Sequence, residues 1–457
     1  MRAFSTLLFV LFALSANAAD GTLGTVSVQK GNNVSVNGEA PLSLTLDGKG
    51  HQSYQCLSKR APDESHEFTW KEVTTTRGGE LAEILGDQLR SVDSLVVKGN
   101  VNDKDFHAMW DASLYGYLSV INLKNAVLEN NAVPDTAFFH ENEQYEGSSH
   151  EIFYYIGLRK IILPEGLEKI GEGAFYQASA LRQVNFPSTL RYIGDFAFNA
   201  TKLEMNQLVI PEGVEEINQY AFAFCRKLKA QVTLPSTIKK IGEWAFYGCP
   251  ITSINLPEGL ESLGSLAFWD CDLREVSIPS SCHEFNEGWQ FGFNRNLEKM
   301  HLPEGMTEIP DHFAVDCFRL REVNFPHTLK HIGEKAFSLC ISLKNVDLPL
   351  GMQSLGEEAF SELEALEQIV FPASMKSLGK NSCSYWKNIK RIYCAAMEPP
   401  VCDPTDGGVF SGFDFPDGLN TPVVYVPKGT INKYKDTSRN CMGWEKFWNY
   451  VEIDPSE

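Results

Sequence analysis

The chain of 457 residues lacks the short signatures that accompany common enzyme sites. It contains no His-Glu-x-x-His zinc motif, no Gly-x-Ser-x-Gly nucleophile elbow and no phosphate-binding P-loop. Its eleven cysteines form no Cys-x-x-Cys pair, and no His/Cys spacing fits a zinc site. These absences predict a protein that is not an enzyme and that needs no cofactor and no metal.

Basic residues and long hydrophobic runs are also scarce. Lys and Arg number 40 against 59 Asp and Glu, which gives a net charge of −19. This charge opposes binding to nucleic acid and to anionic membranes. The apolar run Leu7–Leu14 is too short to cross a bilayer, and it lies within residues 1–18, which have the features of a signal peptide. We therefore expect an exported protein, secreted, at the cell surface or in the periplasm, without membrane insertion.

The chain does contain a repeat centred on proline. Between residues 158 and 393, prolines recur at intervals of 22 to 24 residues. A fixed period in this range indicates a solenoid of stacked repeats. The prolines are Pro164, Pro187, Pro211, Pro235, Pro257, Pro279, Pro303, Pro326, Pro349 and Pro372.

Each repeat predicts one short β-strand directly before its proline. Positions three and one before the proline are apolar, as in Ile254 and Leu256, and the residue between them is often small or polar, as in Asn255. This period of two places apolar side chains in the core and polar ones outside. Proline then ends the strand because it has no N–H to donate to a neighbouring strand.

Other positions of the repeat also recur. A phenylalanine follows each of the first nine prolines by about eleven residues, which predicts a column of buried, stacked rings. The second residue after the proline alternates between Gly, as in Gly166, and Ser or Thr, as in Thr189. Glycine tolerates positive φ, and a hydroxyl can hydrogen-bond to a turn. The alternation therefore predicts a two-repeat unit in which odd and even turns differ in φ.

The repeat unit, as written at residues 256–271, resembles the BspA-type leucine-rich repeat of bacterial surface and secreted proteins. The resemblance implies an α/β fold, namely a leucine-rich-repeat solenoid with mostly short parallel β-strands and about 23 residues per repeat. It also implies a protein that binds another macromolecule.

The flanking regions resemble the same family more loosely. The expected organisation is a signal peptide at 1–18, an N-terminal β cap or mini-domain at 19–80, degenerate repeats at 81–157, the solenoid at 158–393 and a C-terminal cap at 394–457.

The outward polar residues of the predicted sheet are the candidate binding site. Polar side chains on a rigid sheet can form hydrogen bonds with a partner at little ordering cost. We hypothesise that they form a concave face that binds a host extracellular protein or an envelope protein, as an adhesin would. The candidates are Gln183, Asn185, Gln231, Asn255, Glu275, His301, Glu322, Asn324 and Asp347.

Two alternatives remain open. One is a structural envelope protein without a specific ligand. The other is a glycan-binding module that stacks sugar rings on an aromatic strip at the convex side. The strip would comprise Tyr176, Tyr220, Trp244, Tyr247 and Trp269.

The cysteines suggest two different roles. Five lie fourteen residues after a proline and are expected to be a column of small, buried free thiols: Cys225, Cys249, Cys271, Cys317 and Cys340. Cys394 and Cys402 flank a proline-rich loop, and in an exported protein they form a candidate disulfide. An acidic loop with Asp403, Asp406 and Asp414 is more simply a solvated loop than a Ca²⁺ site.

Overall fold

The computed structural model describes residues 67–139, 156–402, 408–412, 421–436 and 443–454, with the backbone of four strands nearer the N-terminus. Those four form two antiparallel pairs: β1 (Thr25–Gln29) with β2 (Asn33–Asn37), and β3 (Ser43–Leu44) with β4 (Tyr54–Gln55). The predicted signal peptide and the acidic loop of Asp403, Asp406 and Asp414 lie outside the described residues.

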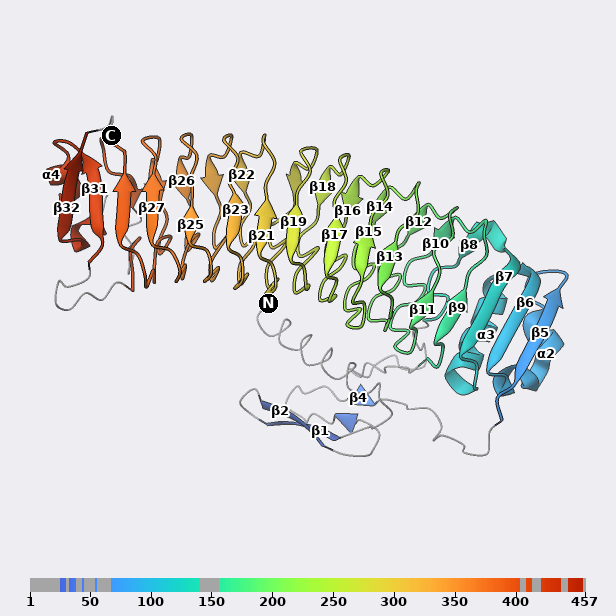
Figure 1. Ribbon diagram of the computed structural model, residues 1–457. Coiled ribbons are helices and arrows are strands. Elements are labelled where there is room, and N and C mark those ends of the chain that lie inside the picture. Colours follow the sequence, from blue (N-terminus) through green and yellow to red (C-terminus); the bar gives the residue numbers. More distant parts are fainter. Residues whose placement is uncertain are drawn as a thin grey trace, which may run out of the picture. The chain divides into compact units, whose positions relative to one another are not determined.

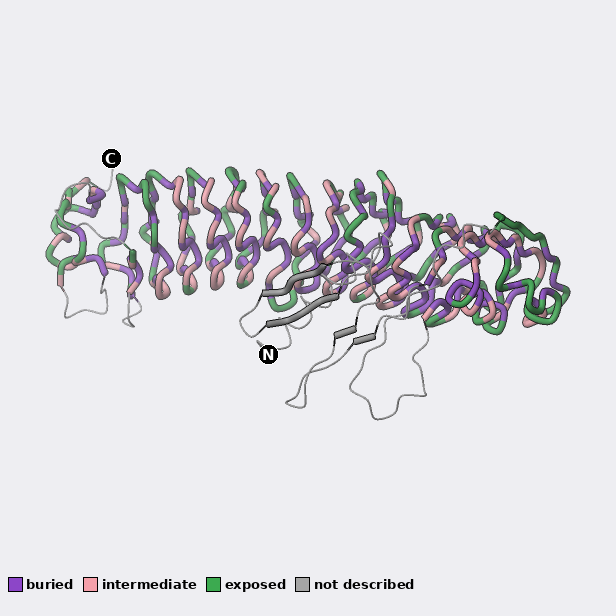
Figure 2. The backbone as a smooth tube through the Cα atoms, turned by 90° about the horizontal axis from the view of Figure 1, so that it is seen from below, coloured by how far each residue is buried: buried purple, intermediate pink, exposed green. Residues whose placement is uncertain are grey.

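The chain divides into two compact units, each built from coils of parallel β-structure (Figure 1). The first unit comprises Met1–Asn206, Ile210–Val214 and Tyr220–Lys229, and the second comprises the remainder. The coils number about 15 and repeat about every 24 residues, which confirms the predicted solenoid. In Figure 2, buried and exposed stretches alternate along each coil, because one side of every strand faces the core.

In the first unit, the strands before the prolines and three earlier strands form one parallel sheet, which we call the first ladder. Its order is β11-β9-β7-β6-β5. The strands are β5 (Trp70–Thr75), β6 (Ser94–Val101), β7 (Val120–Leu128), β9 (Lys160–Ile162) and β11 (Gln183–Val184). The ladder thus begins at Trp70, within the interval assigned from sequence to the N-terminal cap.

Helices accompany only the first and last coils of the described chain. They are α2 (Leu81–Leu85), α3 (Asp103–Tyr115) and α4 (Ile431–Tyr434), with 3-10 turns at Gly86–Ser91, Glu129–Asn131 and Trp444–Lys446. Helix α3 begins with a capping box, in which Asn102 accepts a hydrogen bond from Lys104 N and Asp105 accepts one from Asn102 N. The buried Asp105 carboxylate also accepts hydrogen bonds from Gly79 N and Leu81 N, and so fixes α3 to the preceding coil.

Each of the ten coils with a repeat proline contains a second strand, which the sequence did not predict. It spans only two residues, five and six positions after the proline, and it pairs with its equivalents in a second parallel ladder. In the first unit this second ladder contains β8 (Ala132–Val133), β10 (Lys169–Ile170) and β12 (Tyr192–Ile193). The prediction of one strand per repeat is therefore wrong: the proline turn joins two strands.

In the second unit both ladders are interrupted. The first ladder contains β13 (Gln207–Val209), β15 (Gln231–Thr233) and β17 (Ser253–Asn255); then β19 (Glu275–Ser277), β21 (Lys299–His301) and β23 (Glu322–Asn324); then β25 (Asn345–Val346), β27 (Gln368–Phe371), β29 (Arg391–Cys394), β31 (Val423–Pro427) and β32 (Asn449–Ile453). The second ladder contains β14 (Glu216–Ile217), β16 (Lys240–Ile241), β18 (Ser262–Leu263) and β20 (Glu284–Phe285); then β22 (Glu308–Ile309), β24 (His331–Ile332), β26 (Ser354–Leu355), β28 (Ser377–Leu378) and β30 (Val401–Cys402).

A proline explains the interruption between β20 and β22. In most coils a glycine follows the second strand. Its N–H donates a hydrogen bond to the second strand of the preceding coil, as Gly333 N does to Ile309 O at 2.8 Å. These glycines also lie close to the previous coil, since a Cβ on Gly264 would lie 2.4 Å from Glu243 N. The equivalent residue after β22 is Pro310, which has no N–H to donate to β20. The hydrogen bond that links neighbouring coils elsewhere therefore cannot form there.

The predicted column of phenylalanine rings is confirmed and fills the core. The rings at 175, 198, 222, 246, 268, 291, 313, 337 and 360 are fully buried. Neighbours stack nearly parallel, as Phe246 and Phe268 do at 5.6 Å and 9°. Phe313, displaced by one residue in the sequence, meets Phe291 edge-on at 76°.

The predicted alternation of turns is confirmed for four pairs of coils. Gly166, Gly213, Gly259 and Gly305 have φ between 95° and 110°, whereas their Ser and Thr counterparts do not have positive φ. The hydroxyl joins the two turns of a pair: Thr328 Oγ1 accepts from Gly305 N and donates to Met306 O, both at 2.9 Å. Gly351 is the exception, since its φ is not positive.

The C-terminal coils bury most of their aromatic residues, as expected for a cap. Tyr434, Trp444 and Phe447 are buried, whereas Trp448 is 74% exposed. Within the described part of the chain, no helix has the length and hydrophobicity needed to span a bilayer.

Candidate functional site

The candidate residues of the first ladder lie where the sequence placed them, on its outer face. Outward residues occupy two rows across neighbouring strands. Gln231 is in register with Gln207, and Asn255 with Thr233. In the next part of the ladder Glu275 is aligned with Lys299 and Glu322, and His301 with Asn324.

Several of these candidates are occupied by bonds within the protein. The amide of Asn185 accepts from Leu163 N at 2.7 Å and donates to Leu163 O at 3.0 Å. Asn324 makes the same pair of bonds with Leu302. These two asparagines hold the preceding coil, so part of the hydrogen-bonding capacity of their amides is already used within the protein.

The charged candidates are paired but remain accessible. His301 lies 3.2 Å from Glu275, and Lys299 lies 3.1 Å from Glu322. Exposed pairs of this kind are weak and can exchange partners. Four other candidates are exposed, and their side chains make no hydrogen bond to any described residue: Gln183, Gln231, Asn255 and Asp347.

The structure adds an apolar group to this face that the sequence analysis missed. Val370, Tyr393, Tyr425 and Val451 align in register on β27, β29, β31 and β32. We call them the outer row. The two valines are 46% and 42% exposed, and the tyrosine rings stack at 4.4 Å and 12°. The outer row lies in the same line of outward residues as Asp347, one of the candidates. Extending that line to the later strands of the sequence could have revealed the outer row.

The candidate aromatic strip is half-buried. Tyr176, Tyr220, Trp244, Tyr247 and Trp269 each have intermediate exposure. Their ring faces are covered by neighbouring rings, some of which the sequence analysis missed: Tyr220 stacks on Phe196 at 4.7 Å, and Trp269 lies 4.5 Å from Phe293. A Cβ on Gly292 would lie 2.1 Å from the Trp269 indole. The strip therefore joins successive coils, and neighbouring rings cover part of its surface.

The cysteine column is buried and free, as expected, and it has a further role. Cys271 Sγ donates to Phe246 O and Cys317 Sγ donates to Phe291 O, both at 3.3 Å. Burial raises the pKa of Cys317 to about 12, so the thiol keeps the proton that it donates. The column thus satisfies carbonyl groups of the preceding coil. Trp386 fills the same position and donates from Nε1 to Phe360 O at 2.7 Å.

The candidate disulfide between Cys394 and Cys402 is not formed. Both thiols are free and buried. Cys394 lies on β29 of the first ladder and accepts a hydrogen bond from Tyr434 Oη, whereas Cys402 lies on β30 of the second ladder. Residues that are close in the sequence are thus separated onto two different sheets.

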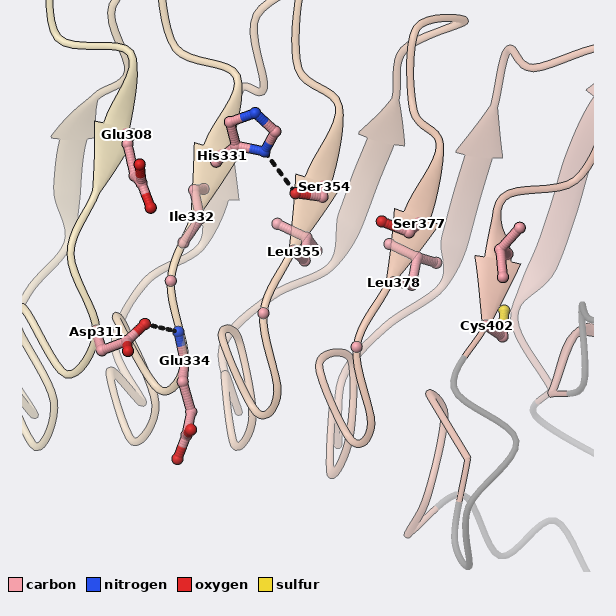
Figure 3. Close-up of a pocket in the computed structure, with 14 residues that line it drawn as sticks. Glu308, Asp311, His331, Ile332, Glu334, Ser354, Leu355, Ser377, Leu378 and Cys402 are labelled. Carbon is pink, nitrogen blue, oxygen red and sulfur yellow. Dashed lines mark hydrogen bonds between the residues drawn. The ribbon is translucent and has the colours of Figure 1, made fainter.

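A groove of about 550 Å³ crosses the second ladder from β22 to β30 (Figure 3). Its outward side chains, one per strand, are Glu308, His331, Ser354, Ser377 and Val401. The hollow exists because the two serines are small, while His331 and Val401 stand higher on either side. His331 Nδ1 lies 2.7 Å from Ser354 Oγ, and Asp311 Oδ1 accepts from Glu334 N at 2.6 Å.

The groove does not have the geometry of a hydrolase site. A nucleophilic serine needs a base, an acid that orients the base and donors for an oxyanion. Here His331 meets Ser354, but no described carboxylate accepts a hydrogen bond from the imidazole. Among the described residues, no group of three His, Cys, Asp or Glu side chains is arranged to hold a metal ion.

Comparisons with known proteins agree with this architecture. A family model described as the BspA type leucine rich repeat region matches residues 148–231, 230–337 and 312–397, which together cover more than half of the chain. No curated protein matches the chain.

Solved structures of bacterial repeat proteins resemble it. A leucine-rich repeat protein from Bacteroides ovatus is 20% identical, with a TM-score of 0.43, over 82% of this chain and 93% of its own. The pneumococcal vaccine antigen PcpA is 18% identical, with a TM-score of 0.38, over 95% of this chain and 100% of its own. A leucine rich cell surface protein from Faecalibacterium prausnitzii is 17% identical, with a TM-score of 0.32, over 78% and 95%.

Proposed function

Because the chain belongs to the BspA-type leucine-rich repeat family, we propose that it is exported and binds another protein through the outer face of its first ladder. Export is supported by residues 1–18, which combine Arg2, an apolar core and the small residues Ala16 and Ala18. The partner is a host extracellular protein or a component of the producer's envelope.

The outer row is the observation that carries this proposal. Tyrosine is enriched at the centre of protein interfaces, because it adds contact area and a hydroxyl at little entropic cost. Here two stacked tyrosines and two exposed valines form one row, with Gln368 and Arg391 beside it on β27 and β29. An apolar centre with a polar rim is the usual arrangement of a binding surface.

The test is a pull-down with the chain from Ala19, against host extracellular matrix and against the producer's envelope. A saturable partner is expected, and the double variant Tyr393→Ser/Tyr425→Ser should weaken its binding at least tenfold. Tyr385→Ser is the matched control, since Tyr385 is a 49% exposed tyrosine outside the first ladder. Unchanged binding in the double variant would show that the outer row is not the binding surface.

Charge reversal tests the polar part of the same face. Glu275→Lys combined with Glu322→Lys would repel Lys299, which lies 3.1 Å from Glu322 and is in register with both. Loss of binding in this variant as well would extend the surface to β19–β23. Loss only in the tyrosine variant would confine it to β27–β32.

A further inference from the structure

The groove on the second ladder contains two carboxylates, those of Glu308 and Asp311. At the equivalent positions of other coils a lysine pairs with the carboxylate. Glu308 and Asp311 form no ion pair with any described residue. The nearby imidazole of His312 does not supply the charge, because burial lowers its pKa and favours the neutral form. Lys335, which follows the groove residue Glu334, contacts Glu334 and Glu358 instead.

The coil of Asp135 serves as an internal comparison for Asp311. Both aspartates follow a proline, and each accepts a hydrogen bond from a glutamate N–H one coil later, Glu172 in one case and Glu334 in the other. The next coil then presents Lys169 to Asp135, with Nζ 3.2 Å from Oδ1. In the groove the residue at the position of Lys169 is His331.

Glu308 has a comparison of its own. Glu216 occupies the same position on β14, and the residue in register with it on the next strand is Lys240, whose Nζ lies 2.7 Å away. The residue in register with Glu308 is again His331. Its Nδ1 lies 2.7 Å from Ser354 Oγ. His331 thus occupies the position from which Lys169 pairs with Asp135 and Lys240 pairs with Glu216 in other coils.

We propose that this groove binds an extended segment of a partner protein that inserts a lysine or arginine side chain between Glu308 and Asp311. The segment continues over Ser354 and Ser377 toward Val401, which is 53% exposed and offers an apolar end. The Ser377 hydroxyl makes no hydrogen bond to a described residue and is available to the segment.

Dimensions and charge both fit this occupant. The four steps from β22 to β30 cover about 19 Å at the usual strand spacing, which corresponds to about six extended residues. The cation would replace the lysine that neutralises the equivalent carboxylates in other coils. The site is on the second ladder, so it is independent of the outer row on the first.

The experiment uses the full chain and mixtures of hexapeptides, each with one fixed position, and identifies the retained peptides by mass spectrometry. Peptides with Lys or Arg at one terminal position should be enriched at least fivefold. His331→Lys should abolish this enrichment, because the new side chain can reach both carboxylates as Lys169 and Lys240 do. Thr233→Lys, which adds the same charge to the exposed face of β15, should leave the enrichment unchanged.

Glu308→Gln provides a second test that does not depend on a new lysine. It should also reduce the enrichment, and the Tyr393→Ser/Tyr425→Ser variant should not. The proposal is overturned if no basic peptide is enriched, or if His331→Lys and Glu308→Gln retain the same peptides as the natural chain. Retention of oligosaccharides in place of peptides would also overturn it.

Discussion

At the scale of single residues, the sharpest requirement of this fold is a left-handed backbone at two positions of each coil. One lies nine residues after the proline and the other thirteen, as in Trp244 (φ 57°) and Phe224 (φ 61°). Residues other than glycine occupy most of these positions, although left-handed φ costs them about 1 kcal/mol. Gly173 and Gly248 show that glycine fits as well.

This strain predicts that Ala200→Gly stabilises the protein or leaves it unchanged. Ala200 has φ 57°, so glycine would relieve about 1 kcal/mol of strain, while its greater freedom in the unfolded chain costs about 0.5–1 kcal/mol. Ala365 is also half-buried but does not have positive φ, so Ala365→Gly should destabilise by about 0.5–1 kcal/mol. Denaturant unfolding measures both variants, and equal destabilisation would contradict the prediction.

His312 predicts a dependence of stability on pH. Its ring stacks on Trp289 at 3.6 Å, and burial lowers its pKa below the usual value of 6.5. The unfolded chain therefore takes up the proton first as the pH falls below about 6.5, and the free energy of unfolding decreases by at most about 1.4 kcal/mol per pH unit. The decrease ends at the pKa of the folded state, and His312→Gln should remove it.

Tryptophan fluorescence checks the same titration in the folded state. A protonated imidazole stacked on an indole quenches its emission, so the signal of Trp289 should fall on acidification before the protein unfolds. Trp289→Phe should remove the change and Trp244→Phe should keep it. If the Trp289→Phe variant still showed the fall in emission on acidification, another pair of groups would be responsible for it.

At the scale of elements, the sequence predicted the strand before each proline, the phenylalanine column and the alternating turns, because each depends on a residue type with one dominant preference. The second strand was missed because it is two residues long and its outward position holds residues as different as Lys169, Tyr192 and Ser354. The groove was missed for the same reason, since it lies on that strand. The left-handed positions were missed because aromatic and aliphatic side chains hold them in place of glycine or asparagine.

The paired turns are the element that a single hydroxyl can test. Thr328→Val keeps the shape of the side chain but removes the bonds to Gly305 N and Met306 O, and it should cost about 1–2 kcal/mol. Thr307→Val is the control, because the Thr307 side chain is exposed and makes no hydrogen bond to a described residue. The difference in unfolding free energy between the two variants measures the contribution of the hydroxyl. Equal values would show that the paired turns add no stability.

At the scale of the whole molecule, a solenoid is held together by contacts between neighbouring coils, so its stability is a sum of local terms. In the second unit, the contact between the coils of β20 and β22 contributes less than the others. The second ladder stops at Pro310, although the first ladder continues there from β19 to β21. The buried atoms His312 Nδ1, two residues after Pro310, and Gln290 Oε1, in the preceding coil, have no hydrogen-bond partner. Coils on the two sides of Pro310 should therefore open separately.

Hydrogen exchange on two core variants tests this separation. Phe268→Ala and Phe337→Ala each remove one ring of the buried column and should cost about 3–5 kcal/mol. If Pro310 divides the unit, Phe337→Ala should accelerate amide exchange in β24 and β26 and leave β16 and β18 protected, and Phe268→Ala should do the reverse. Acceleration on both sides in either variant would mean that the first ladder and the phenylalanine column, which continues from Phe291 to Phe313 at 5.4 Å, transmit unfolding across the gap in the second ladder. The two outcomes thus distinguish whether the break in the second ladder is enough to limit the length over which this solenoid unfolds cooperatively.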